Sequence, residues 1–299
     1  MSQLFVETSL VKWRRDGERP EEGPEAQMEL HRFESRVTSS APDVHMPTIL
    51  CLHGMTECGL VFSNWTSCIP NVRILALNRP GYGRSSEPPT DAPYGFKQFA
   101  SDVHQVLLGC GIEKVDAVVG HSSGGPNALA LAHYLGPDVV NRCILVASDV
   151  EYASDAAKGL KDPLADNLDA FLKSPINPDA SAEQLGFVTS REKVLLEKSA
   201  YRDSVRYNQG KISGVRHDYQ IERTAWDFDV SSLKMEGRVC VVIGDQDPFI
   251  SIDHAKYFQK VLGPQVPVIV KPGYGHFDIV LDDEAAYSIL QLAIHGWGK

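Results

Sequence analysis

The apolar residues of the chain gather in six short runs, separated by longer stretches of mixed character. Each run holds nearly continuous apolar residues, which is typical of strands buried on both faces of a sheet. The predicted strands are Thr48–Leu52, Val72–Leu77, Val115–Val119, Cys143–Ala147, Val239–Ile243 and Val266–Val270. Between them, apolar residues recur at helical spacing, as at Phe96, Phe99 and Val103. Alternating strands and helices predict a mostly parallel central sheet with helices on both faces.

Two segments depart from this rhythm. Leu4–Trp13 and Met28–Val37 flank a polar stretch and predict a hairpin that leads into the sheet. The region from Glu151 to Thr224 is polar and helix-prone, has no buried-strand run, and contains one predicted amphipathic helix over 193–208. We expect a core domain of residues 1–150 and 226–299, and a helical cap formed by the insertion 151–225 over the carboxyl edge of the sheet.

The composition is that of an ordinary globular protein. The chain has 299 residues, of which 43% are hydrophobic and 23% charged, and its formal net charge is −10. An acidic surface disfavours nucleic acid as a partner. No run approaches the roughly 20 apolar residues that span a bilayer, and the first residues lack the pattern of a signal peptide. We therefore expect a cytoplasmic monomer or homodimer with no membrane span.

The cysteines and histidines give no indication of a metal or cofactor. Cys51, Cys143 and Cys240 lie inside predicted strands and are expected to be buried free thiols. No cysteine pair has C-x-x-C spacing, and no H-x-x-x-H or comparable ligand cluster occurs. The sequence therefore predicts no metal site and no cofactor.

A candidate nucleophile follows the third of the six predicted strands. Residues 120–124 read Gly-His-Ser-Ser-Gly, a G-x-S-x-G pattern between a strand and a helix. A serine on such a turn adopts a strained backbone and projects its hydroxyl from the sheet edge. The pattern selects Ser122 over Ser123, because only Ser122 has glycine at both −2 and +2.

A base and an acid can reach the same edge. The sequence GDQD, which contains Asp245 and Asp247, follows the fifth predicted strand, and His276 lies in a glycine-bounded loop after the sixth. The carboxyl ends of parallel strands meet at one edge, where open sheets place their sites. The order Ser, Asp, His is that of triads built around this kind of serine turn.

A second loop could stabilise negative charge on a substrate. His53, Gly54 and Met55 directly follow the first of the six predicted strands. In a hydrolase the backbone N–H of Met55 would donate to the oxyanion, together with the N–H of Ser123 at the start of the following helix. The helix N-terminus adds a favourable partial positive charge.

Taken together, these motifs resemble the α/β-hydrolase superfamily, from about Thr48 to the C-terminus. The resemblance is carried by HG at 53–54, NRPGYGRS at 78–85, GHSSGG at 120–125, GDQD at 244–247 and GYGH at 273–276. It implies an α/β-hydrolase fold of the capped, esterase-like kind, and a catalytic triad in which Asp247, rather than Asp245, is the acid. Many members open the 78–85 loop with Asp where this chain has Asn78, but that loop is structural in the family.

Several other residues could take part. His53, His121 and Trp226 are candidates for lining a substrate pocket. A residue beside the nucleophile, such as His121, usually packs against or supports the turn, and Trp226 could equally pack the cap. Asp149 follows the fourth predicted strand, where a minority of these folds place the acid.

The expected function is that of a serine hydrolase. Ser122 would attack the carbonyl of a small, fairly apolar ester, thioester or lactone, and water activated by His276 would release the acid. A serine rather than an aspartate nucleophile argues against the haloalkane dehalogenase and epoxide hydrolase branches. Two alternatives stay open at this point: hydrolysis of a carbon–carbon bond beside a ketone, and a ligand-binding receptor or scaffold on a hydrolase fold.

Overall fold

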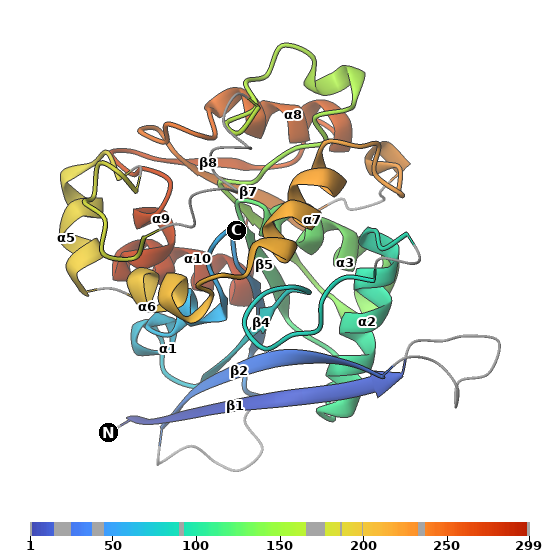
Figure 1. Ribbon diagram of the computed structural model, residues 1–299, viewed down its shortest axis with the longest axis vertical. Helices are drawn as coiled ribbons and strands as arrows, with labels where there is room; N and C mark the ends of the chain where they lie inside the picture. The colour runs from blue at the N-terminus through green and yellow to red at the C-terminus, as the bar shows by residue number, and fades with distance from the viewer. Residues whose placement is uncertain are drawn as a thin grey trace.

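The computed structural model describes residues 2–14, 25–37, 45–89, 93–165, 177–185, 187–198, 200–232 and 237–297. One sheet of eight strands, in the order β1-β2-β4-β3-β5-β6-β7-β8, runs through these residues, with helices on both of its faces (Figure 1). The strands are β1 (Ser2–Arg14), β2 (Glu25–Val37), β3 (Thr48–Leu52), β4 (Val72–Asn78), β5 (Ala117–His121), β6 (Cys143–Val146), β7 (Val239–Gly244) and β8 (Val268–Lys271).

Strands β3 to β8 pair in parallel, whereas β1 and β2 form an antiparallel hairpin whose second strand pairs antiparallel with β4. The mostly parallel sheet predicted from the apolar runs is thereby confirmed, as is the N-terminal hairpin. Because the parallel strands all point the same way, the loops after β3, β5, β6, β7 and β8 leave the sheet at one edge.

The central strands are buried on both faces, which explains their continuous apolar sequences. One apolar cluster packs the sheet against α2 (Phe96–Gly109), α3 (Gly124–Val139) and α8 (Ile252–Leu262). The second packs it against α1 (Trp65–Cys68), α9 (Asp278–Leu281) and α10 (Asp283–His295). Among the described residues, no helix has both the length and the apolar character needed to cross a membrane.

Strand β8 differs from the expectation of full burial. It is the last strand in the sheet order, so only β7 pairs with it. Its four residues are half-buried or exposed, and Val270 is 42% exposed. An edge position explains this, because an apolar run alone cannot distinguish a central strand from an edge strand.

Between β6 and β7 the chain forms short helices and no strand in its described parts. In the described residues these are η2 (Asp155–Ala157), α5 (Ser190–Lys198), α6 (Ala200–Tyr207), α7 (Ile212–Glu222) and η3 (Val230–Ser232). The single helix predicted over 193–208 is replaced by α5 and α6. Leu196 and Tyr201, which are both buried, are five positions apart, so one uninterrupted helix would not place them on the same face. Both belong to the second apolar cluster, and this segment therefore packs directly onto the sheet layer.

Candidate active site

Ser122 occupies the sharp turn between β5 and α3. Its φ of 51° lies in the left-handed region that non-glycine residues rarely adopt. The glycines on either side make the turn possible. A Cβ at Gly120 would lie 2.2 Å from the carbonyl oxygen of Gly124, and one at Gly124 would lie 2.3 Å from the carbonyl oxygen of Leu52. The G-x-S-x-G pattern therefore reflects close packing of strand against helix around a strained serine.

His276 and Asp247 are in direct contact, although 29 residues separate them in the sequence. The ring Nδ1 of His276 lies 2.7 Å from Asp247 Oδ2. The other carboxylate oxygen accepts the backbone N–H groups of Phe249 and Ile250 at 2.8 and 2.9 Å, which fixes the orientation of the acid. With Nδ1–H donating to Asp247, the basic lone pair of His276 is on Nε2.

Ser122 and His276 both line a cavity of about 130 Å³ at the carboxyl edge of the sheet. Its walls are largely apolar and include Leu185, Tyr201 and Phe277. No lysine or arginine is among the described residues that line it. Across the described ranges, no three side chains of the His, Cys, Asp or Glu type are grouped so as to hold a metal ion.

A second carboxylate lies beside the nucleophile. Ser122 Oγ is 3.4 Å from Asp149 Oδ2, and Asp149 lies just beyond the end of β6. Asp149 Oδ1 accepts the hydroxyl of Tyr152 at 2.6 Å. Asp149 therefore contacts the serine, whereas Asp247 contacts the histidine.

The two expected oxyanion donors belong to two different segments of the chain. Met55 lines the cavity from the loop after β3, and Ser123 stands at the N-terminus of α3. The backbone N–H of Gly54, the residue before Met55, donates to Glu57 Oε2 at 3.1 Å and is therefore not free to bind an oxyanion. The N-terminus of α3 contributes partial positive charge at this point.

Acidic groups tune the histidine. Burial by itself lowers the pKa of His276, because it penalises the charged ring. The carboxylate of Asp247, assisted by those of Glu57 and Asp149, outweighs burial and raises the pKa above the ordinary histidine value. His276 is therefore a stronger base than a free histidine side chain.

The sequence matches a known family. A family model described as the alpha/beta hydrolase fold matches residues 47–283. The chain belongs to the alpha/beta hydrolase family.

Curated relatives resemble only part of this alpha/beta hydrolase. Epoxide hydrolase B of Mycobacterium tuberculosis is 35% identical over 130 residues, which are 42% of this chain and 34% of that protein. Lipase LipV of the same organism is 33% identical over 127 residues, which are 42% of this chain and 44% of that protein. The matched stretch thus spans less than half the length of either relative.

Solved structures show the same fold over nearly the whole chain. A probable hydrolytic enzyme from Pseudomonas aeruginosa superposes with a TM-score of 0.71 at 18% identity, covering 97% of this chain and 94% of that one. The esterase RhEst1 from Rhodococcus sp. gives a TM-score of 0.70 at 17% identity, covering 97% and 100%. At such low identity these matches establish the fold alone.

Two histidines suggested as pocket residues support the loops of this alpha/beta hydrolase and do not line the cavity. His53 is fully buried, with Nδ1 2.7 Å from the carbonyl oxygen of Gly54 and Nε2 accepting the N–H of Arg79 at 3.3 Å. Burial, together with the positive charge of Arg79, lowers the pKa of His53 well below its usual value, so the ring is neutral. His121 Nε2 lies 3.0 Å from the backbone oxygen of His276.

Trp226 also lies outside the residues that line the cavity. Its ring stacks on Phe228 at a centroid distance of 5.3 Å and packs at 5.3 Å against Phe96 of α2. The tryptophan is only 7% exposed and belongs to the first apolar cluster. The expectation that it lines the pocket is therefore corrected: its large apolar surface is used in the core.

Three buried glutamates near the site had no signal in the sequence. Glu57 accepts from Gly54 as described. Glu192 of α5 accepts the backbone N–H of Phe277, next to His276, at 3.0 Å. Glu222 of α7 accepts the hydroxyl of Ser123. An isolated glutamate in a polar stretch normally indicates solvent exposure, so only the folded chain reveals these contacts.

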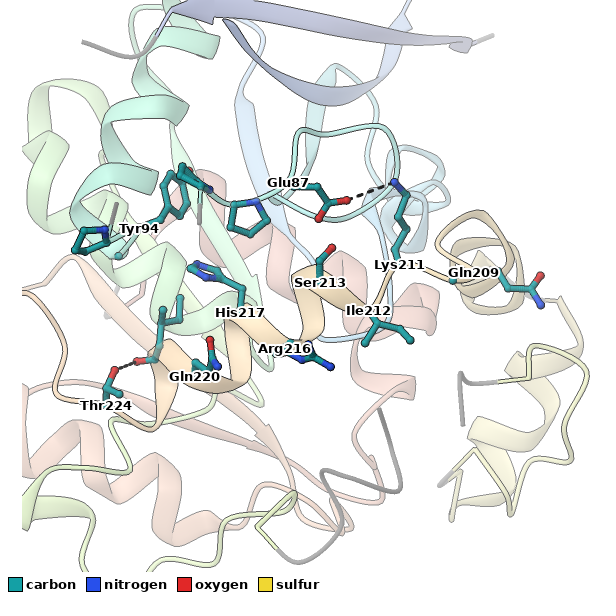
Figure 2. Close-up of a pocket in the computed structure, with 16 residues that line it drawn as sticks. Glu87, Tyr94, Gln209, Lys211, Ile212, Ser213, Arg216, His217, Gln220 and Thr224 are labelled. Atoms are coloured by element: carbon teal, nitrogen blue, oxygen red, sulfur yellow. Dashed lines mark hydrogen bonds and ion pairs between the residues drawn. The ribbon is translucent and has the colours of Figure 1, made fainter. Parts of the chain in front are cut away.

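A larger open groove of about 1100 Å³ lies between α7 and the segment around Pro88 and Tyr94 (Figure 2). Helix α7 presents Arg216, His217 and Gln220 to this groove. Neither Ser122 nor His276 lines this groove. Both side chains line the smaller cavity instead.

Proposed function

We propose that this protein is a serine hydrolase that cleaves small carboxylic esters through an acyl-enzyme. The observation that carries the proposal is the joint geometry of Ser122 and His276. The serine stands on a strained turn, and the histidine, held by Asp247 at 2.7 Å, opens onto the same cavity. A nucleophile, a base and a group that orients the base form the minimal set for acyl transfer.

In the proposed first step, Ser122 Oγ attacks the ester carbonyl carbon while His276 Nε2 takes the hydroxyl proton. The carbonyl oxygen becomes an oxyanion and accepts hydrogen bonds from the N–H groups of Met55 and Ser123. When the tetrahedral intermediate collapses, the bond from carbon to the alcohol oxygen breaks. His276 returns the proton to the departing alcohol, and the acyl group stays on Ser122.

In the second step, water replaces the alcohol. His276 removes a proton from the water as its oxygen bonds to the acyl carbon. Collapse of the second intermediate breaks the bond to Ser122 Oγ, which recovers its proton, and the carboxylic acid leaves. Asp247 stabilises the imidazolium that forms in each step.

The cavity supports a small, apolar acyl group. Its volume of about 130 Å³ is far below the 300–1,000 Å³ typical of sites for drug-sized ligands. Leu164, Leu185 and Ile250 supply apolar wall. Short-chain esters are therefore the proposed substrates, with thioesters and lactones of similar size as variants of the same chemistry.

Ester hydrolysis is favoured here over epoxide opening. One curated relative is named an epoxide hydrolase and another a lipase. A serine nucleophile gives an ordinary ester with a carboxylic substrate, and His276 can direct water at that ester. The proposal therefore follows the chemistry of Ser122.

A panel of short and long acyl esters tests this function directly. We expect turnover of the short esters, and a loss on the order of 10⁶ in kcat for Ser122→Ala, the scale seen when a triad nucleophile is removed. Ser288→Ala, which changes a half-buried serine on α10, is the matched control and should keep wild-type rates. Turnover that survives in Ser122→Ala, or no turnover of any ester by the wild type, would refute the proposal.

A further inference from the structure

Helix α7 contacts the nucleophile turn through an unusual pair of buried side chains. The hydroxyl of Ser123 donates to Glu222 Oε1, across 99 positions of sequence. Both residues are 0% exposed. Ser123 is the N-cap residue of α3, where a serine hydroxyl ordinarily accepts from the helix backbone. Here it makes no such capping bond and points instead to α7.

Glu222 is itself fixed on its other side. Its Oε2 accepts from Arg223 Nη1 at 2.9 Å, and Arg223 in turn forms two bonds to Asp162, at 2.7 and 2.5 Å. Burial, followed by repulsion from Asp149, raises the pKa of Glu222 well above its usual value. Burying a carboxyl group costs free energy of folding unless hydrogen bonds compensate. Here both oxygens of Glu222 have such partners, Ser123 and Arg223.

One turn earlier on α7, a second carboxylate contacts the same region. Asp218 Oδ2 lies 2.7 Å from Arg79 Nη1, and the two side chains are almost completely buried. Arg79 Nη2 donates to the carbonyl oxygen of His53 at 2.9 Å, and its Nη1 lies 3.4 Å from Ser123 Oγ. Positions 218 and 222 share one face of the helix. Helix α7 therefore contacts the start of α3 through Glu222, and it reaches the loop that leads to Met55 only through Arg79.

We propose that Glu222 is a positioning residue that holds Ser123, and with it the backbone N–H expected to bind the oxyanion, against helix α7. This proposal rests on the proposed ester hydrolysis and concerns the same site. Glu222 does not touch the substrate; it acts through the hydroxyl of Ser123. The position of the Ser123 N–H therefore depends on how α7, a helix between β6 and β7, packs against the start of α3.

The expected effect follows from how sharply oxyanion donors depend on distance. Complete loss of one donor costs about 10²–10³ in kcat, and a displacement near 1 Å costs about 10². With Glu222 removed, Ser123 keeps its N–H but loses the acceptor that sets its position. We therefore expect Glu222→Ala to lower kcat about 10- to 100-fold and to change KM less than threefold.

Three further variants separate positioning from general stability. Glu222→Gln keeps an acceptor oxygen and should retain most of the kcat that Glu222→Ala loses. Ser123→Ala removes the same hydrogen bond from the other end and should lose a similar fraction of kcat. In the Ser123→Ala background, Glu222→Ala should have little further effect, because coupled residues are not additive. Gln220→Ala, on the exposed side of the same helix, is the matched control (Figure 2).

The decisive measurement is kcat and KM for a short ester across this set, with hydrogen exchange of the peptide around residues 120–125 as a second readout. Faster exchange in Glu222→Ala or Ser123→Ala than in Glu222→Gln and Gln220→Ala would support the tether, meaning the hydrogen bond from Ser123 to Glu222. Either alanine variant suffices if the other does not fold. Wild-type kcat and exchange in Ser123→Ala, or an equal loss from Glu222→Ala with and without Ser123, would overturn it. If the wild type hydrolyses no ester, the proposed function fails, and exchange alone decides the tether.

Discussion

Two aspartates are close enough to the catalytic side chains to be considered for the acid, and their contacts differ. Asp247 bonds the His276 ring at 2.7 Å, whereas Asp149 lies 3.4 Å from the Ser122 hydroxyl. Only the first contact can hold the imidazole in the tautomer with a free Nε2. In the proposed mechanism, Asp247 alone orients His276.

This assignment predicts unequal effects of two matched substitutions. Asp247→Asn should lower kcat about 10⁴-fold, because the amide stabilises the wrong histidine tautomer. Asp149→Asn should cost far less, since its amide oxygen can still accept from Ser122. Steady-state kinetics of both variants on one ester make the comparison. Equal losses would mean that Asp149 shares the role of the acid.

The raised pKa of His276 predicts a shifted pH profile. The base must be neutral to accept a proton, so kcat/KM should fall as the pH drops through the pKa of His276. Because nearby carboxylates raise that pKa, the midpoint should lie above the ordinary value of about 6.5. Asp247→Asn should move the midpoint down, whereas Asp253→Asn, on the exposed side of α8, should not. A wild-type midpoint at or below 6.5 would contradict the electrostatic account.

The carboxylates of Glu57 and Asp149, both lining the cavity, predict discrimination against negative charge. Monoethyl succinate and its neutral counterpart ethyl 4-methylpentanoate have similar shapes. We expect kcat/KM to be at least about tenfold lower for the anion, because like charges a few ångströms apart repel by more than 1.4 kcal/mol at the dielectric of a protein surface. Glu57→Gln should bring the kcat/KM values of the two esters closer together, because it removes one of the two negative charges. Equal rates for the two esters in the wild type would exclude this effect.

The sequence could predict the position of residues that directly follow strands. Ser122, Asp247 and His276 each follow a recognisable apolar run, and parallel strands bring their ends to one edge. Glu222 has no such marker, because its partner Ser123 lies 99 positions away in the sequence and meets it only when α7 lies against the start of α3. Contacts that form only when a helix packs against a distant segment leave no local pattern in the sequence.

At the scale of elements, the strands were predicted most accurately. The predicted strand Thr48–Leu52 coincides with β3, and Val72–Leu77 differs from β4 by one residue. Burial on both faces produces this signal, and the half-exposed edge strand β8 shows its limit. The helices between β6 and β7 were predicted less well, since α5 and α6 have short, irregular apolar spacing.

The packing of Trp226 predicts a loss of stability in place of a change in selectivity. Trp226→Ala should lower the free energy of unfolding by about 3–5 kcal/mol, as truncation of a buried aromatic residue does. Ratios of kcat/KM between esters should stay unchanged. Denaturant unfolding and an ester panel measure the two effects, with Tyr287→Ala, an exposed aromatic on α10, as the control. A change in the kcat/KM ratios between esters for Trp226→Ala would indicate that the Trp226 ring contacts the substrate.

Leu185, in the cavity wall, is expected to behave differently. Leu185→Ala should change the kcat/KM ratios between esters by an amount equivalent to about 1–3 kcal/mol.

At the scale of the whole molecule, one sheet edge collects loops from nearly the full length of the chain. Residues from 54 to 277 line a single cavity, and the segment between β6 and β7 supplies part of its wall while sharing the apolar clusters of the sheet. Reaction site and fold are therefore built from the same packing. In the proposed mechanism, one serine in this cavity, Ser122, is the nucleophile.

Labelling with a serine-directed phosphonate, followed by peptide mass spectrometry, tests this claim most directly. A strained serine beside an activated histidine should react rapidly, and the account predicts one adduct per chain, on Ser122, absent from Ser122→Ala and greatly slowed in His276→Ala. The neighbouring Ser123 provides an internal comparison within the same peptide. An adduct on Ser123, or labelling that persists unchanged in Ser122→Ala, would contradict the account.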